Sequence, residues 1–152
     1  MGIAEDIKQK KFKSELDKAI VNILFTNSWL HEKQLQLFHP HGLTIPQYNV
    51  LRILRGQYPK SSTVNLIIER MLDRMSNASR IVDKLEQKGM VMREQSKKDR
   101  RAVDVLITQK SLTILEKLDI EMERWEKTLT GITEKEAKQL NELVDKLRVN
   151  QS

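Results

Sequence analysis

The stretch from Asp73 to Thr108, DRMSNASRIVDKLEQKGMVMREQSKKDRRAVDVLIT, decides the fold. Apolar residues recur through its first half at a helical spacing, which predicts one buried helix face made by Ala78, Ile81, Val82 and Leu85. Asp73 is a candidate N-cap, because a carboxylate can accept hydrogen bonds from the unpaired backbone N–H groups of a first helical turn. Gly89 suits the position just after the helix, where glycine adopts a positive φ at little cost.

A β-hairpin is predicted directly after this helix. Met90–Gln95 and Ala102–Ile107 have the character of two short strands, and valine or isoleucine occupies alternate positions from Val103 to Ile107. The tip between them, Ser96–Arg101, is strongly charged. A helix with one polar face followed by a basic hairpin predicts a winged helix-turn-helix, mostly α-helical with a small β-wing.

The polar side of this helix carries residue types that contact base edges in the major groove. The candidates in its N-terminal half are Arg74, Ser76, Asn77, Ser79 and Arg80. Asn77 has the amide that pairs with adenine, and Arg80 has the fork that pairs with guanine or, equally well, with a phosphate. The alternative is a solvated helix face without a ligand.

The hairpin tip carries four cations, Lys97, Lys98, Arg100 and Arg101. Cations at a wing suit contacts with phosphates and with narrow A·T-rich minor grooves, where negative potential is concentrated. A tip can also be charged only to stay soluble. Four cations beside the polar-faced helix favour DNA binding.

Charge is concentrated around this stretch. The 152 residues carry 27 Lys/Arg and 21 Asp/Glu, a net charge of +6. Residues 71–101 contain nine Lys/Arg against five Asp/Glu, a net +4, whereas residues 111–152 contain seven against nine, a net −2. A local excess of cations favours binding to phosphates.

Several classes of protein are disfavoured by the composition. The chain has no cysteine, which excludes disulfides and thiolate metal sites. It has no signal-peptide pattern and no apolar run approaching the ~20 residues that span a bilayer, so we expect a soluble, cytoplasmic protein. The three histidines, His31, His39 and His41, lack further ligands to complete a metal site. No catalytic motif is present, so neither an enzyme nor a cofactor is expected.

The residues before the central stretch predict three helices. Residues 4–38 form one long helical pattern with a heptad-like stripe, ended by the segment His39-Pro40-His41-Gly42. Thr44 caps a second helix with Pro46 in its first turn. Ser61, Ser62 or Thr63 opens a third, and Leu72-Asp73 is the predicted turn into the polar-faced helix.

Residues 109–152 predict two further helices. Thr108 can cap the first, whose apolar stripe is Leu115, Leu118, Met122, Trp125 and Leu129. Thr133 and Glu136 form a capping box before the second. Because the core of residues 43–108 cannot cover the stripes at both ends, two chains are expected to pair through residues 1–38 and 109–152. A helical hairpin within a monomer is the alternative.

Three motifs together resemble the MarR family of winged-helix transcriptional regulators. Leu43–Leu51 is similar to the family's entry to its second helix, Ser79–Val91 to the end of its recognition helix, and Asp99-Arg100-Arg101 with Thr108 to its wing signature. Two positions depart from the pattern: Ser111 stands where glycine is usual, and the third helix carries Ile67-Ile68 in place of a Leu-Ala pair.

The resemblance implies a function and two residue roles. It marks Arg101 as the minor-groove residue and Asp99 as a residue that pairs to hold the tip. It implies a homodimeric repressor of a pseudo-palindromic operator, released by a small aromatic or phenolic effector that binds between the dimerisation helices and the core. Phe25, Trp29, His31, Tyr48 and Arg52 are near that region in sequence, but ordinary core or surface positions are favoured for them over ligand contacts, and they are not predicted as sites. The rivals are a non-specific architectural DNA-binding module and a winged-helix protein–protein adaptor.

Overall fold

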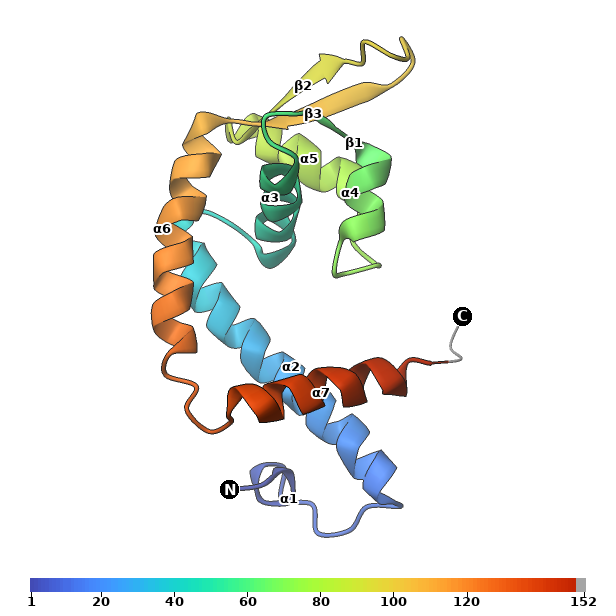
Figure 1. The fold of residues 1–152 in the computed structure, drawn as a ribbon, viewed down its shortest axis with the longest axis vertical. Coiled ribbons are helices and arrows are strands. Elements are labelled where there is room, and N and C mark those ends of the chain that lie inside the picture. The colour runs from blue at the N-terminus through green and yellow to red at the C-terminus, as the bar shows by residue number, and fades with distance from the viewer. Residues whose placement is uncertain (150–152) are drawn as a thin grey trace. The chain divides into compact units, whose positions relative to one another are not determined.

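The structure is a computed structural model that describes residues 1–149. It divides into two compact units, residues 1–118 and residues 119–152, and the boundary falls inside one helix. Figure 1 shows the order of the elements along the chain. The first unit contains α1 (Ile3–Asp6), α2 (Glu15–Phe38), the 3-10 helix η1 (His39–His41), α3 (Ile45–Gln57), β1 (Ser62–Thr63), α4 (Val64–Arg70), α5 (Ala78–Gln87), β2 (Val91–Gln95), β3 (Val103–Ile107) and the start of α6 (Gln109–Glu126). The rest of α6 and α7 (Glu134–Leu147) belong to the second unit.

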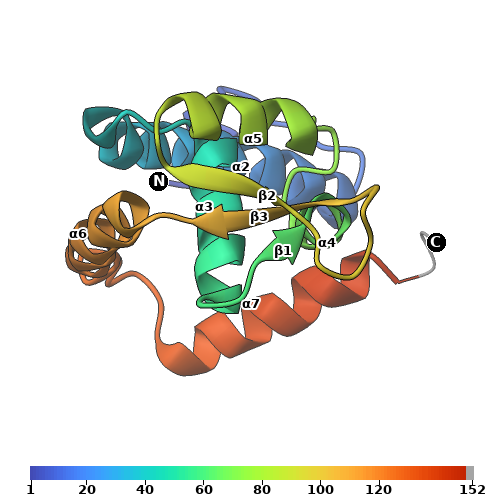
Figure 2. The same cartoon turned by 90° about the horizontal axis from the view of Figure 1, so that it is seen from above.

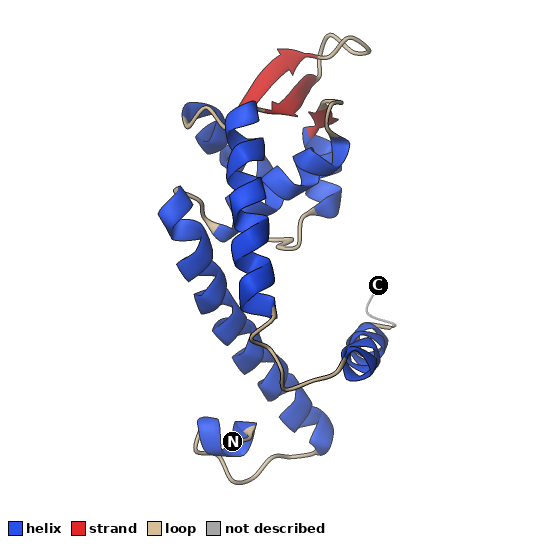
Figure 3. Cartoon of the chain, turned by 60° about the vertical axis from the view of Figure 1, so that its left-hand side comes forward, coloured by secondary structure: helices blue, strands red, loops and turns tan. Residues whose placement is uncertain are grey.

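A small antiparallel sheet forms one end of the first unit (Figure 3). The strand order is β1-β3-β2, with Val91 opposite Ile107 and Gln95 opposite Val103 in the hairpin. The winged fold predicted from the sequence is therefore confirmed. Strand β1 was not predicted, and it adds Ser62 opposite Val105 on the other edge of β3.

The core of this unit lies between α3, α4, α5 and the sheet. Its side chains are less than 4% exposed and include Leu51, Leu54, Ile67, Val82, Leu85, Val91, Val105 and Ile107. Three of the four residues of the predicted apolar face of α5, Ala78, Val82 and Leu85, are buried, and the fourth, Ile81, is half-buried. The alternation in β3 also holds near the core, although Val103, at the outer end of the strand, is 45% exposed.

The prediction of one continuous helix over residues 4–38 is wrong. The chain forms a single turn, α1, and begins α2 only at Glu15. Ser14 causes the new start, since its hydroxyl accepts from the N–H of Asp17, and the Asp17 carboxylate in turn accepts from the N–H of Lys13. Lys8 between the two helices has a φ of +55°, which no helix interior allows.

Helix α6 ends at Glu126, so Leu129 of its predicted stripe lies beyond the helix. Three predicted helix starts are confirmed. Thr44 and Gln47 form a capping box at the start of α3, and Thr133 and Glu136 form one at the start of α7. Of the three residues that could open the third helix, Thr63 does so by accepting from the N–H of Leu66. Among residues 1–149, no helix is long and apolar enough to cross a membrane.

Candidate nucleic-acid interface

The polar-faced helix α5 begins later than the sequence suggested. Asp73 is not its N-cap; Asn77 is, and the Asn77 Oδ1 accepts from the N–H of Arg80 at 3.1 Å. The turn from α4 to α5 is correspondingly longer than Leu72-Asp73. Both residues have good capping side chains. Asp73 is instead bonded within the turn, where the Ser76 hydroxyl donates to it, and the helix is capped by the residue that follows Ser76.

Asp73 fixes this turn by accepting two hydrogen bonds. Its Oδ1 accepts from the N–H of Met75 at 2.9 Å, and its Oδ2 accepts from the hydroxyl of Ser76 at 2.8 Å. The Ser76 hydroxyl and, to a smaller extent, the Met75 N–H lower the pKa of Asp73, because both bonds favour the carboxylate. The backbone ahead of α5 is thereby held by a charged side chain.

The predicted contact residues of α5 lie at its exposed N-terminal end. Arg74, Asn77, Ser79 and Arg80 are exposed and Ser76 is half-buried. Because the Asn77 oxygen is engaged as the helix cap, the amide N–H groups are what this side chain has left to donate. Arg80 projects from the first turn, opposite the buried face made by Ala78 and Val82.

Hydrogen bonds connect the segment just after α5 to the start of α6. Gly89 has a φ of +69°, and the N–H of Met90 reaches back to the carbonyl of Leu85 at 2.9 Å, as in a Schellman motif. Ser111, the departure from the family pattern, is fully buried and donates its hydroxyl to the carbonyl of Met90 at 2.6 Å. Thr108 also donates to this region, with its Oγ1 2.9 Å from the carbonyl of Gly89.

The hairpin tip is shaped by side-chain oxygens that accept from its own backbone. Asp99 Oδ1 accepts from the N–H of Arg101 at 2.9 Å, and the buried Ser96 accepts from the N–H groups of Lys98 and Asp99. Asp99 thus holds the tip through the backbone of Arg101. Lys97, Lys98, Arg100 and Arg101 are all exposed.

The two groups of candidate residues lie toward the same side of the unit. Figures 1 and 2 both place the N-terminal end of α5 and the tip of the β2–β3 hairpin at the same side, with α5 running beside the sheet. An exposed helix end with hydrogen-bonding side chains and a cationic hairpin together form a surface suited to a polyanion.

Two further basic residues, Arg93 and Lys88, make contacts within the protein that were not predicted from the sequence. Arg93 of β2 donates to Asp83 and Glu86 of α5. Lys88, just after α5, donates to the carbonyl of Gly42 at 2.5 Å and to Gln47 at 2.9 Å. The nine cations of residues 71–101 therefore include two whose side chains are engaged within the protein. The contact of Arg93 with α5 had a signal in the sequence. Asp83 and Glu86 are three residues apart on the helix, and Arg93 is on the inward-facing side of β2.

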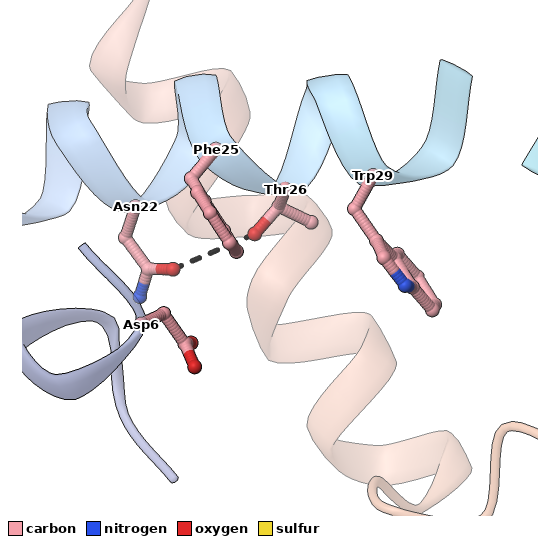
Figure 4. A pocket seen from close by; sticks show the side chains of 5 residues that line it. All are labelled: Asp6, Asn22, Phe25, Thr26 and Trp29. Carbon is pink, nitrogen blue, oxygen red and sulfur yellow. Dashed lines mark hydrogen bonds between the residues drawn. The ribbon is translucent and has the colours of Figure 1, made fainter. Parts of the chain in front are cut away.

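A pocket of about 390 Å³ lies between α1 and α2, away from the winged core (Figure 4). It is lined by Asp6, Asn22, Phe25, Thr26 and Trp29. Tyr48, another residue weighed as a ligand contact, is buried and stacks on Phe38 with ring centroids 4.0 Å apart. Across residues 1–149, no three His, Asp or Glu side chains form a group that could hold a metal ion.

Comparisons with known proteins agree with this geometry. The MarR family model matches residues 43–103. The regulator MgrA of Staphylococcus aureus, an HTH-type transcriptional regulator, is 30% identical over 112 residues, which cover 74% of each chain. The S. aureus MepR–DNA complex has a TM-score of 0.75 at 19% identity and covers 86% of this chain and 95% of MepR. The organohalide-sensing regulator RdhR, solved with 2,4-dichlorophenol, has a TM-score of 0.78 at 17% identity and covers 92% of this chain and 85% of RdhR.

Proposed function

The chain belongs to the MarR family of DNA-binding transcription regulators, which are not enzymes, and we propose that it is a repressor that binds a pseudo-palindromic operator as a homodimer. The observation that carries this proposal is the surface shared by the N-terminal end of α5 and the hairpin tip. On it, α5 enters the major groove and the tip reaches the neighbouring minor groove.

In this proposal the residues have distinct tasks. Arg80 and the Asn77 amide contact bases, while Arg74, Ser76 and Ser79 contact bases or phosphates. At the tip, Arg101 enters the minor groove, and Lys97, Lys98 and Arg100 contact phosphates, with Asp99 shaping the loop. All these side chains except that of Ser76 are exposed.

Dimerisation is proposed through residues 1–38 and 109–152, which flank a DNA-binding core of residues 43–108. Large apolar side chains on α2 are exposed, among them Leu16 at 58% and Leu24 at 65%. On α7, Leu140 and Leu143 are 52% and 65% exposed. Several large apolar side chains exposed along one helix are typical of a surface that contacts a partner. A second copy gives the twofold symmetry that an operator with two half-sites requires.

The proposal includes control by a small aromatic or phenolic effector. This part rests on the fold shared with RdhR, which was solved with 2,4-dichlorophenol. An effector can release DNA only if it binds more tightly to a conformation that does not bind the operator. A phenolic compound that weakens DNA binding would support this part, and failure of a phenol panel to do so would count against it.

The test is fluorescence anisotropy of the full chain with its own upstream intergenic DNA and with a scrambled duplex, at ~150 mM salt. We expect specific binding at least ~10³-fold tighter than binding to the scrambled duplex. Arg80→Ala and Arg101→Ala should each strongly reduce this preference. Lys138→Ala, on the exposed side of α7 away from Leu140 and Leu143, should preserve it.

Two results would contradict the proposal. Equal weak binding to both duplexes that falls steeply with salt, followed by a random-site selection that enriches no sequence, would identify an architectural module that contacts only the DNA backbone. Absence of binding to any duplex would leave the protein–protein adaptor.

A further inference from the structure

The helix proposed to enter the major groove carries two carboxylates. Within Ala78–Gln87, Asp83 and Glu86 offset the charges of Arg80 and Lys84, so α5 by itself has no net charge. The side chains of Asp83 and Glu86 are 54% and 44% exposed. Carboxylates beside DNA phosphates are repelled by them, and like-charge contacts at an interface weaken binding.

One arginine outside the helix, Arg93 of β2, forms ion pairs with both carboxylates. Arg93 Nη1 lies 2.5 Å from Asp83 Oδ1 and 3.4 Å from Glu86 Oε1. The backbone N–H of Arg93 donates to Glu86 Oε2 at 3.2 Å, and its Nη2 lies 3.5 Å from the carbonyl oxygen of Ser79. A single residue of β2 thus bonds to three successive turns of α5.

The sheet explains why Arg93 is in position to do this. Val91 and Arg93 are two residues apart in β2 and therefore point to the same side of the sheet, and Val91 is buried there. Arg93 pairs with Val105, which is fully buried. Its side chain is only 27% exposed, and its planar fork reaches both carboxylates.

We propose that Arg93 is a positioning residue for DNA binding. It holds α5 against the first strand of the wing and neutralises Asp83 and Glu86, and it does so without contacting DNA itself. This inference rests on the proposed function only in taking α5 as the helix that meets DNA. Of the nine cations in residues 71–101, Arg93 is thus one that pairs with carboxylates of the protein and does not contact DNA phosphates.

The experiment compares three variants of the full chain in the anisotropy assay. Arg93→Gln removes the neutralising charge and should weaken binding about tenfold, as expected for uncompensated like charges at an interface. Arg93→Gln with Asp83→Asn removes one uncompensated carboxylate and should recover most of that loss. Arg93→Gln with Glu94→Gln has the same net charge, but Glu94 is exposed on the other side of β2, so it should recover little.

Each other outcome overturns the proposal. If neither second substitution restores binding, neutralising Asp83 is not what Arg93 contributes to binding. If both restore it equally, only the total charge of the protein matters. If Arg93→Gln binds DNA as the unchanged chain does, Arg93 has no part in binding. Thermal unfolding of each variant separates these results from loss of structure. Should Arg93→Gln fail to fold, Arg93→Ala in the Asp83→Asn and Glu94→Gln backgrounds replaces it in the same comparison.

The comparison does not depend on finding an operator. It can be made with a random-sequence duplex at low salt, since repulsion between Asp83 and phosphates does not require a specific base. Failure to select an operator would contradict the proposed sequence-specific function and would still allow the role of Arg93 to be measured.

Discussion

The side chain of Asn77 has two roles, one in the stability of α5 and one proposed in DNA binding. Its Oδ1 caps α5 by accepting from the N–H of Arg80, and its amide N–H groups are proposed to face the DNA. Most residues of the proposed interface bear on binding alone, because they are exposed. Asn77 bears on stability and on binding, and substitutions can separate the two.

Asn77→Ala should lower the free energy of unfolding by about 1 kcal/mol, because the first turn of α5 loses its cap. Asn77→Ser keeps an oxygen that can cap the helix but removes the amide, so it should remain nearly as stable and still bind DNA more weakly. Urea unfolding and anisotropy measure the two effects. Equal unfolding midpoints for the Ala and Ser variants would show that the cap contributes nothing.

The neighbouring turn should respond to pH through Asp73. The Ser76 hydroxyl and the Met75 N–H lower the pKa of Asp73 below its ordinary value of 3.8. Because this pKa is lower in the folded state, the turn gains stability above the unfolded pKa and loses it as the pH falls through the folded pKa. An NMR titration of the Asp73 carboxyl carbon measures this pKa directly.

Ser76→Ala removes the larger cause and should raise the pKa of Asp73 toward 3.8. Ser79→Ala is the matched control, since Ser79 gives Asp73 no hydrogen bond in the structure, and it should leave the titration unchanged. An Asp73 titration that is the same in both variants would contradict the geometry of this turn.

Elements with their own local signals could be predicted from the sequence. Helix α5 has a helical apolar period, Gly89 ends it, and the alternation in β3 identifies the hairpin. The capping boxes of α3 and α7 each depend on four consecutive residues. These features depend on neighbours in the chain, so a single sequence contains them.

Features that depend on competition or on distant pairing could not be predicted. The apolar pattern continues through Ser14, which hid the start of α2. Strand β1 has two residues, too few for any period, and exists because β3 offers it an edge. The choice between Asp73 and Asn77 as N-cap depends on the turn between α4 and α5, which the sequence does not specify.

The wing offers a test of the role of Asp99. Asp99→Ala removes the acceptor for the Arg101 N–H, so hydrogen exchange at this amide should speed up and DNA binding should weaken several-fold. Global stability should change by less than about 0.5 kcal/mol, because the tip is exposed. Lys97→Ala, at the same tip, should weaken binding without faster exchange at Arg101. Unchanged exchange in Asp99→Ala would show that Asp99 does not hold the tip.

The assembly proposed for the chain depends on apolar side chains far from the wing. Leu143 of α7 is 65% exposed, so Leu143→Glu should scarcely affect the fold of a single chain. If α7 lies in the dimer interface, this charge should shift the protein from dimer to monomer in sedimentation experiments and weaken operator binding with it. Asn141→Glu, which adds the same charge on the exposed side of α7 facing away from Leu143, is the control. Dimers that persist in Leu143→Glu would exclude Leu143 from the interface.

Sequence-specific recognition by a twofold-symmetric dimer is tested most directly by random-site selection with the unchanged full chain. We predict an enriched motif with two inverted half-sites about one helical turn apart. Arg80→Ala should relax the sequence preference within each half-site, and Arg101→Ala should relax the A·T preference beside it. A selection that enriches no sequence, or one that enriches a motif unaffected by Arg80→Ala, would contradict recognition through α5.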